Sequence, residues 1–431
     1  MKCVATCLAL AVSASAFAVP ELTGLTVNQD GAKVLTVSFS LSEKAIVTMD
    51  ILTNGVSIGA DNYRTLREPL SPKDEFPANR IVAAGQHVWM WRPTREWPGY
   101  KFENGEFNVE VKAWSLDAPP DYMVLTCNAT SNAPSFYARV EDLPDGGIKT
   151  ADPNDAEAVE ALKQDVYRTS KLVLRKIPAD GVKWRMGSST DEANRQADEV
   201  PHYVTLTNDY YVSIYPLTFT QTRVLLGTED SINVNICPKY NYQYTEGRGN
   251  YSTSYSWPDD GYAVSSGSGF GKMRKRTGLR FDFLTEAEWE YACRAGTEGR
   301  WNDDGSDPNA VAWTSYTGGA KGNAVGLKKP NAWGLYDMHG LVQEWVLDQY
   351  GPYPMESVIA PVGVSTNVTK RILRGGPKAV RDAGGSYNSS AKISTRSAYR
   401  TSDMGSNRQD GNNNGYGVRV GCPAALPAWL R

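Results

Sequence analysis

The side chains with the widest chemical repertoire are scarce in this chain of 431 residues. Its 3 histidines, His87, His202 and His339, lie far apart in the sequence. A multi-histidine metal site or a histidine-based acid/base relay needs several such side chains in one place. The small number and wide spacing argue against both, and we expect His202 and His339 to be structural.

The N-terminal residues 1–18 have the form of a secretory signal. Lys2 precedes a short apolar stretch, and Ala16-Phe17-Ala18 supplies small residues at its end. The alternative is a buried N-terminal helix. Cleavage near Ala18 predicts a secreted, periplasmic or cell-surface protein.

Four of the 6 cysteines would remain after that cleavage: Cys127, Cys237, Cys293 and Cys422. An even number in an exported protein permits two disulfides, and buried structural thiols are the alternative. Their spacing does not decide which would pair. It contains no C-x-x-C pair, so a zinc site is not indicated.

The overall composition is that of a packed globular protein. The 45 basic and 48 acidic residues nearly cancel, and 41% of the residues are hydrophobic. Near-neutral charge argues against a nucleic-acid partner, because such affinity rests largely on neutralising phosphates. After the N-terminus no apolar run is long enough to span a membrane. The length predicts two or three domains.

Strand patterns dominate residues 20–140. Hydrophobic residues alternate with polar ones over 35–41, 45–51 and 107–113, which predicts half-buried strands. We therefore predict an all-β, immunoglobulin-like sandwich here. Three tryptophans in this region are interpreted as core or strand-edge residues, with carbohydrate stacking as the alternative: Trp89, Trp91 and Trp97.

A linker is predicted over 141–169, with a short amphipathic helix at 156–167. From 170 to 422 the chain is dense in Gly, Trp, Tyr and Asn. The clearest helix start is Thr285-Glu286-Ala287-Glu288, because Thr285 can cap the helix while Glu288 reaches back to its amide. We expect this helix to end near Gly296.

A series of segments in the predicted second domain resembles one known family. In chain order they are IPADGVKWRMGSS (177–189), EVPHYVTLTNDYYVSIYPLTFTQ (199–221), FLTEAEWEYACRAG (283–296), NAWGLYDMHGLVQEW (331–345), RILRGG (371–376), RSAYR (396–400) and NNNGYGVRV (412–420). Residues 170–422 resemble the formylglycine-generating enzyme, or sulfatase-modifying-factor, family. The resemblance implies an α+β fold, irregular and related to C-type lectins, after the predicted sandwich.

The resemblance also implies bound calcium. Calcium takes about 6–8 oxygen ligands, and carbonyls of a rigid loop serve well. By resemblance, one family calcium site falls on Asp337, Gly340, Val342 and Glu344. The alternative is that Asp337 and Glu344 pair with arginines or cap turns. A second family site, expected after Trp313, is left unassigned.

One departure from the family pattern bears on catalysis. Oxidase members use two cysteines shortly after the RGG signature to bind copper, but residues 375–400 contain none, and Pro377 follows RGG. Serine hydroxyls there cannot replace thiolates, the soft ligands that select Cu(I). Copper and oxidase activity are therefore not expected, and no catalytic residue is assigned. Iron chemistry is not expected either, because it needs a histidine–carboxylate cluster.

Three functions remain open. The first is a non-catalytic binding module for a glycan or protein ligand, with ligand-binding candidates Tyr387, Arg396, Tyr399 and Arg400. The second is an enzyme, either an active oxidase or one of unknown chemistry, with the candidates Asp348, Arg374, Asp382, Arg396, Tyr399 and Arg400. The three arginines among them are more simply expected to tie loops to carboxylates. The third is a structural role at the cell envelope.

Overall fold

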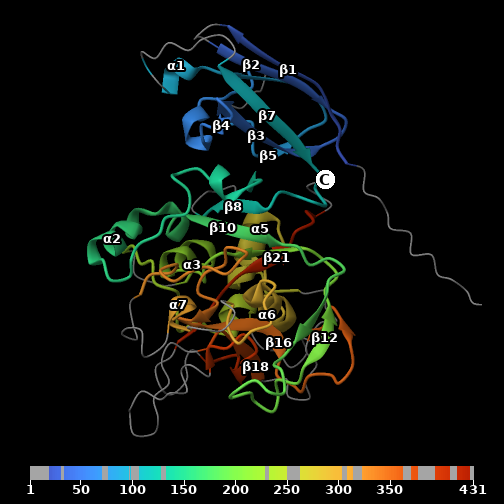
Figure 1. Ribbon diagram of the computed structural model, residues 1–431, viewed down its shortest axis with the longest axis vertical. Helices are drawn as coiled ribbons and strands as arrows, with labels where there is room; N and C mark the ends of the chain where they lie inside the picture. The colour runs from blue at the N-terminus through green and yellow to red at the C-terminus, as the bar shows by residue number, and fades with distance from the viewer. Residues whose placement is uncertain are drawn as a thin grey trace, which may run out of the picture.

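The computed structural model contains an all-β part and a mixed α/β part, stacked along the long axis of the molecule (Figure 1). It describes residues 19–30, 34–69, 76–96, 98, 106–127, 133–228, 233–249, 263–302, 308–313, 323–362, 370–376, 394–407 and 415–427. The predicted signal segment 1–18, Trp97, Asp382, Tyr387 and the unassigned loop after Trp313 lie outside these ranges. In the described part, no helix has the length and apolar character needed to cross a membrane.

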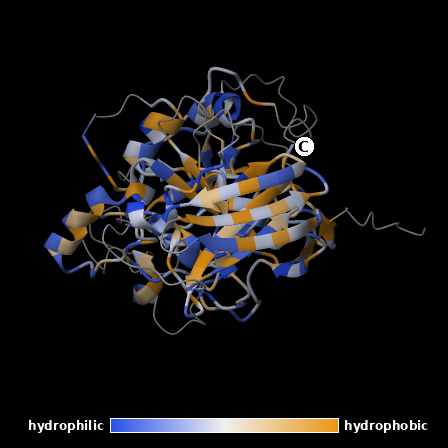
Figure 2. Ribbon diagram, turned by 90° about the horizontal axis from the view of Figure 1, so that it is seen from above, coloured by the Kyte–Doolittle hydropathy of each residue, from blue (hydrophilic) through white to orange (hydrophobic). Residues whose placement is uncertain are grey.

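The N-terminal part consists of two antiparallel sheets. One has the order β1 (Leu22–Asp30), β2 (Val34–Leu41), β6 (Gly85–Trp91), and in the other β3 (Ala45–Thr53) pairs with β4 (Val56–Ser57), β5 (Arg80–Val82) and β7 (Phe107–Trp114). One hydrophobic cluster includes buried residues of both sheets, so they enclose a shared core. Figure 2 looks down on this part and shows hydrophobic and hydrophilic residues alternating along its strands.

The three alternating patterns are confirmed as strands β2, β3 and β7. In β2 every second residue is buried, as expected for a strand with one face on a core. Trp89 and Trp91 are 0% exposed, which confirms the core interpretation for these two and excludes carbohydrate stacking on them.

The structure differs from the predicted boundary at residue 140. Strands β8 (Tyr122–Thr126) and β9 (Ser135–Tyr137) belong to a five-stranded sheet of the second part, with the order β21 (Gly421–Pro423), β13 (Tyr210–Ser213), β10 (Lys171–Ile177), β8, β9. Strand β8 pairs antiparallel with β10. The residues of β8 are mostly apolar and three of them are buried in a row, which indicates a buried strand but not which sheet it joins.

Residues 141–169 also differ from a simple linker. They form helix α2 (Ala156–Ala161) and three short 3-10 turns, η2 (Val140–Asp142), η3 (Leu162–Gln164) and η4 (Val166–Arg168). Asp165 and Arg168 make an ion pair in which both side chains are 0% exposed. The Nε of Arg168 donates to the Val325 carbonyl at 3.0 Å. This segment is therefore packed into the second part.

The remaining strands form small sheets around the helices. These are β11 (Lys183–Met186), β12 (His202–Thr205) and β17 (Val358–Ile359); β14 (Ala312–Trp313) with β15 (His339–Gly340); and β19 (Thr401–Met404), β18 (Lys370–Arg374), β16 (Gln343–Gln349), β20 (Tyr416–Gly417). The helices are α3 (Phe219–Leu225), α4 (Tyr244–Arg248), α5 (Gly269–Thr277), α6 (Glu286–Arg294) and α7 (Pro308–Val311), with α1 (Pro93–Glu96) and the 3-10 turn η1 (Ala60–Tyr63) in the first part.

Helix α6 begins with the predicted capping box. The Thr285 hydroxyl accepts from the Glu288 amide at 3.1 Å, and the Glu288 carboxylate accepts from the Thr285 amide at 2.8 Å. The helix ends at Arg294, where Ala295 takes a left-handed conformation and Gly296 follows. The predicted start and end are confirmed.

We expect Thr285→Ala to lower the free energy of unfolding by about 1 kcal/mol, because an N-cap hydroxyl is lost. Thr285→Ser keeps that hydroxyl and should retain most of the stability. Differential scanning calorimetry of the whole chain would measure both. Equal losses in the two variants would show that the methyl group, not the cap, carries the effect.

Candidate functional site

The predicted metal residues lie in one tightly folded segment, 337–344. Asp337 and Leu341 both have left-handed backbone, with φ of 57° and 62°. The Gly340 amide donates to the Gly375 carbonyl at 2.6 Å. A Cβ on Gly340 would lie 2.1 Å from the Trp313 carbonyl oxygen, so only glycine allows this close approach. The segment is thus clamped between β14 and the RGG turn.

Asp337 is a buried carboxylate with one uncommitted oxygen. Its side chain is 2% exposed, and Oδ2 accepts from the Gly326 amide at 2.6 Å. Oδ1 is buried and has no hydrogen-bond partner among the described residues. Burial raises the pKa of Asp337 to about 6, although the Gly326 amide, Arg419 and Arg168 act in the opposite direction. This oxygen is open to a proton or a cation.

Glu344 is committed to other partners. Its two oxygens accept from the Nε of Arg419 at 3.0 and 2.9 Å, and Oε2 also accepts from the Trp289 indole at 2.6 Å. Glu344 therefore pairs with an arginine, which is the alternative that the sequence left open. Within the described ranges, no cluster of three or more His, Cys, Asp or Glu side chains could hold a metal.

The predicted residues fit a cation best at Asp337. The Gly340 carbonyl already accepts from the Val342 amide at 2.7 Å, although a carbonyl has a second lone pair. A cation here would use Asp337 and loop carbonyls, and would compete with Arg419 for Glu344. The assignment of calcium to these four residues stays a prediction.

A buried ion-pair network joins α6 to the segments around the RGG signature. It consists of Glu286, Glu290, Arg294, Arg374 and Arg400, all less than 5% exposed. Arg400 binds Glu286 through two bonds of 2.9 and 2.8 Å, and Arg294 binds Glu290 at 2.9 Å. Arg374 contacts both carboxylates, with 3.4 Å to Glu286 and a closer bond to Glu290.

The network keeps its charges despite burial. Desolvation acts to raise the pKa of Glu290, but Arg294 and Arg374 outweigh it and lower that pKa below its ordinary value. The pKa of Arg374 is raised, because the neighbouring anionic groups outweigh the burial that acts against its charge. Glu290 and Arg374 therefore form a fixed ion pair.

The predicted ligand-binding residues are divided by the structure. Arg396 is 0% exposed and binds Glu199 at 2.8 and 2.6 Å and Glu192 at 2.5 Å. Arg400 is buried in the network described above, and Tyr399 is half-buried. Tyr387 lies outside the described residues. Arg374, Arg396 and Arg400 each bind carboxylates, as expected for arginines that tie loops together. A ligand-binding role for the predicted residues stays a prediction.

The cysteines of the described residues are mostly buried. Cys127, Cys293 and Cys422 are buried and free, and Cys237 is half-buried. Burial raises the pKa of Cys127 and Cys293 to about 12, and raises that of Cys422 as well. All three thiols are therefore protonated near neutral pH, which makes them poor nucleophiles and metal ligands.

Cys293 nevertheless lies beside a histidine. Its Sγ is 3.6 Å from Nε2 of His339, while Nδ1 of that ring is 2.7 Å from the Thr395 carbonyl. A carbonyl can only accept, so Nδ1 carries a proton, and Nε2 accepts from the Asn302 amide at 3.3 Å. His339 is 1% exposed. The pair is thus a buried thiol hydrogen-bonded to a neutral imidazole, which agrees with a structural role for His339.

Sequence reasoning did not single out the acidic half of the network. Glu286, Glu290 and Arg294 are spaced by four residues, so they lie on one face of α6. The sequence signal for this part of the network was the position of these three charged residues, which share a helix face with the apolar Trp289. Their partners come from residues about 80–110 positions away, which no local pattern identifies.

The fold and these contacts define a mixed α/β domain whose signature segments are braced internally by ion pairs. The family model described as "Sulfatase-modifying factor enzyme 1-like domain" matches residues 175–422. The chain belongs to this family, which confirms the resemblance seen in the sequence.

Two kinds of known protein are similar to the chain. A formylglycine-generating enzyme of Streptomyces coelicolor is 32% identical over 158 residues, which cover 33% of this chain and 46% of that enzyme. A protein named serine/threonine-protein kinase pkn1, of Chlamydia pneumoniae, is 26% identical over 286 residues, covering 64% of this chain and 43% of that protein. The chain spans less than half the length of these relatives.

Among solved structures, PvdO from Pseudomonas aeruginosa is 25% identical with a TM-score of 0.43, and the alignment covers 58% of this chain and 94% of that one. Treponema denticola variable protein 1 is 21% identical with a TM-score of 0.42, covering 59% and 95%.

Proposed function

We propose that the chain is an exported, non-catalytic family member, a calcium-stabilised binding or surface module for a glycan or protein ligand. The observation that carries this proposal is the position of the cysteines. None lies between Cys293 and Cys422, so the region after the RGG turn offers no thiolate pair for copper. The cysteines on either side of this region in the sequence, Cys293 and Cys422, are both buried.

The ionisable groups of the signature segments support the same proposal. Glu286, Glu290 and Glu344 are each bound to at least one arginine. A general acid or base needs a pKa near the working pH and contact with substrate. Carboxylates that are buried and held by guanidinium groups do not meet the second requirement, so the described part of these segments is suited to rigidity.

A direct assay tests the absence of oxidase activity. We expect a peptide with a Cys-x-Pro-x-Arg motif, incubated with the mature protein, copper and oxygen, to be recovered with its cysteine unchanged by mass spectrometry. The Streptomyces coelicolor formylglycine-generating enzyme is the positive control. Aldehyde formation by this chain would overturn the non-catalytic proposal and favour the alternative, an active oxidase.

The binding role needs a separate test. In this proposal the N-terminal sheets are an immunoglobulin-like sandwich that acts as a spacer or second binding face, and residues 1–18 direct export. A glycan array probed with the mature protein should give hits. These hits should persist in a buffer without copper, in which oxidase catalysis does not occur. A lattice or surface assembly without any ligand is the remaining alternative, and self-association without array hits would favour it.

A further inference from the structure

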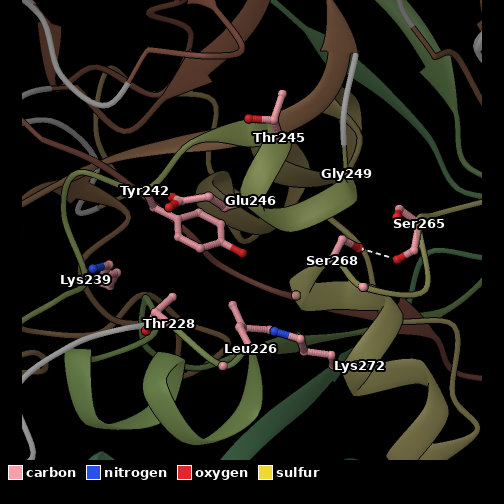
Figure 3. Close-up of a pocket in the computed structure, with 13 residues that line it drawn as sticks. Leu226, Thr228, Lys239, Tyr242, Thr245, Glu246, Gly249, Ser265, Ser268 and Lys272 are labelled. Carbon is pink, nitrogen blue, oxygen red and sulfur yellow. Dashed lines mark hydrogen bonds between the residues drawn. The ribbon is translucent and has the colours of Figure 1, made fainter. Parts of the chain in front are cut away.

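A polar cavity lies apart from the signature segments, at the start of helix α5. Its volume is about 670 Å³, and the described residues that line it are 226–228 after α3, Lys239, Tyr242, residues of α4 with Gly249, and residues between 265 and 272. Cavities of roughly 300–1,000 Å³ are the usual size for small-molecule sites. Figure 3 shows the side chains that line it.

Tyr242 places an unused hydroxyl in this cavity. Its side chain is 0% exposed, and its Oη has no hydrogen-bond partner among the described residues. Figure 3 shows the hydroxyl pointing into the space between Glu246, Ser268 and Leu226. A buried polar group without a partner costs free energy, so such a group is usually satisfied by a ligand or by water.

The Tyr242 hydroxyl is a hydrogen-bond donor at every relevant pH. Burial, with a smaller contribution from Glu246, raises the pKa of Tyr242 well above its ordinary value. A protonated phenol donates one hydrogen bond. It therefore suits an acceptor-rich ligand.

The start of α5 adds backbone donors on the same side. Ser268 caps the nine-residue helix through the Gly271 amide, which leaves the Gly269 and Phe270 amides without an intrahelical acceptor. A Cβ on Gly269 would lie 2.8 Å from the Tyr242 hydroxyl oxygen, so the hydroxyl sits directly against this first turn. Amides and the dipole at a helix start favour anions.

Lys272 supplies the positive charge. It extends from α5 toward the end of α3, where its Nζ would lie 2.8 Å from a Cβ placed on Gly227. No ion pair holds its ammonium within the described ranges. Lys239, on the other side, contacts the Phe219 ring at 4.7 Å. Among the described residues that line the cavity, the one carboxylate belongs to Glu246, and its Oε2 accepts from the Gln243 amide at 2.7 Å.

From these contacts we propose that the cavity binds a small ligand through a phosphate or sulfate group, held by the Tyr242 hydroxyl, the Lys272 ammonium and the first amides of α5. A tetrahedral oxyanion offers several acceptor oxygens at once, which matches three kinds of donor along the wall of one cavity. The inference rests on the proposed binding function and supplies the ligand chemistry for it.

The test is a titration of the mature protein with inorganic phosphate and with sulfate, at constant ionic strength against chloride, by isothermal calorimetry. We expect saturable binding. Tyr242→Phe should weaken it about tenfold, the value of a hydrogen bond to a charged group. Because the hydroxyl has no partner in the described structure, the same variant should melt at the same temperature as the parent or higher when no anion is present.

Lys272→Gln should also weaken binding about tenfold, and its exposed position makes a folding defect unexpected. Lys275→Gln removes an equal charge from the exposed face of the same helix, outside the cavity, and should leave the affinity unchanged. Non-saturable stabilisation by sulfate, or equal affinities in parent and Tyr242→Phe, would overturn the proposal.

Comparing a phosphorylated, a sulfated and an uncharged form of the same sugar then identifies the source of the anion. Binding of the uncharged sugar alone, insensitive to Tyr242→Phe, would overturn the anion site and leave the binding-module proposal standing. Aldehyde formation in the oxidase assay would remove the binding-module proposal whatever anion is bound.

Discussion

Arg374→Met is expected to lower the free energy of unfolding by about 3–5 kcal/mol, because it leaves buried carboxylates without their cation. Arg374 is 0% exposed and lies between Glu286 and Glu290. It also donates to the carbonyls of Ser397 and Ala398 at 3.0 Å each. One side chain therefore connects α6, β18 and the segment after residue 394. Calorimetry and urea unfolding of the full chain would measure the loss.

A matched control lies on the same strand. Lys370→Met removes a positive charge from an exposed position of β18, and we expect a change within about 0.5 kcal/mol. Combining Glu290→Gln with Arg374→Met should cost less than the sum of the two single changes, because the residues share one interaction. A loss of unfolding free energy below about 1 kcal/mol for Arg374→Met would contradict the bracing role and favour a functional role for this arginine.

The second large effect concerns Asp337 and pH. Its pKa is raised to about 6 in the folded protein, against an ordinary 3.8. The native state therefore binds more protons than the unfolded chain between about pH 4 and pH 6, so the stability that this group contributes is present below that window and lost as the pH rises through it. The loss should be about 3 kcal/mol, at about 1.4 kcal/mol for each unit of pKa.

Asp337→Asn has no such titration. In metal-free buffer with EDTA, the parent should lose about 3 kcal/mol more than the variant between pH 4 and pH 6, and the difference between the two curves removes the contribution of other groups. Urea unfolding at a series of pH values measures it. Parallel curves would show that the Asp337 pKa is not raised.

Calcium can be tested with the same pair of proteins. At pH 7.5, calcium should raise the melting temperature of the parent relative to EDTA, because binding to the native state stabilises it. The rise should be smaller for Asp337→Asn, because the amide oxygen can still bind calcium but carries no charge. An unchanged melting temperature in the parent would contradict the calcium prediction. It would leave the pH prediction intact, since that one needs only a buried carboxylate.

Local features of this protein were predictable from the sequence because their causes are local. The capping box at Thr285 needs residues three apart, and the alternation in β2 needs only a period of two. The family of residues 175–422 was also recognisable, because its segments recur in order along the chain. The missing cysteine pair after the RGG signature is likewise a property of the sequence itself.

The partners of individual side chains were decided by the tertiary structure. Arg374 meets Glu290 across 84 residues, and β8 pairs with β10 although its residues were predicted to belong to the first domain. Whether Asp337 carries a spare oxygen, and whether the Tyr242 hydroxyl lacks a partner, depends on which groups surround each one after folding. A sequence specifies which groups can donate, accept or carry charge, but only the packed chain determines which of them remain unpaired, because pairing is a property of distance and burial.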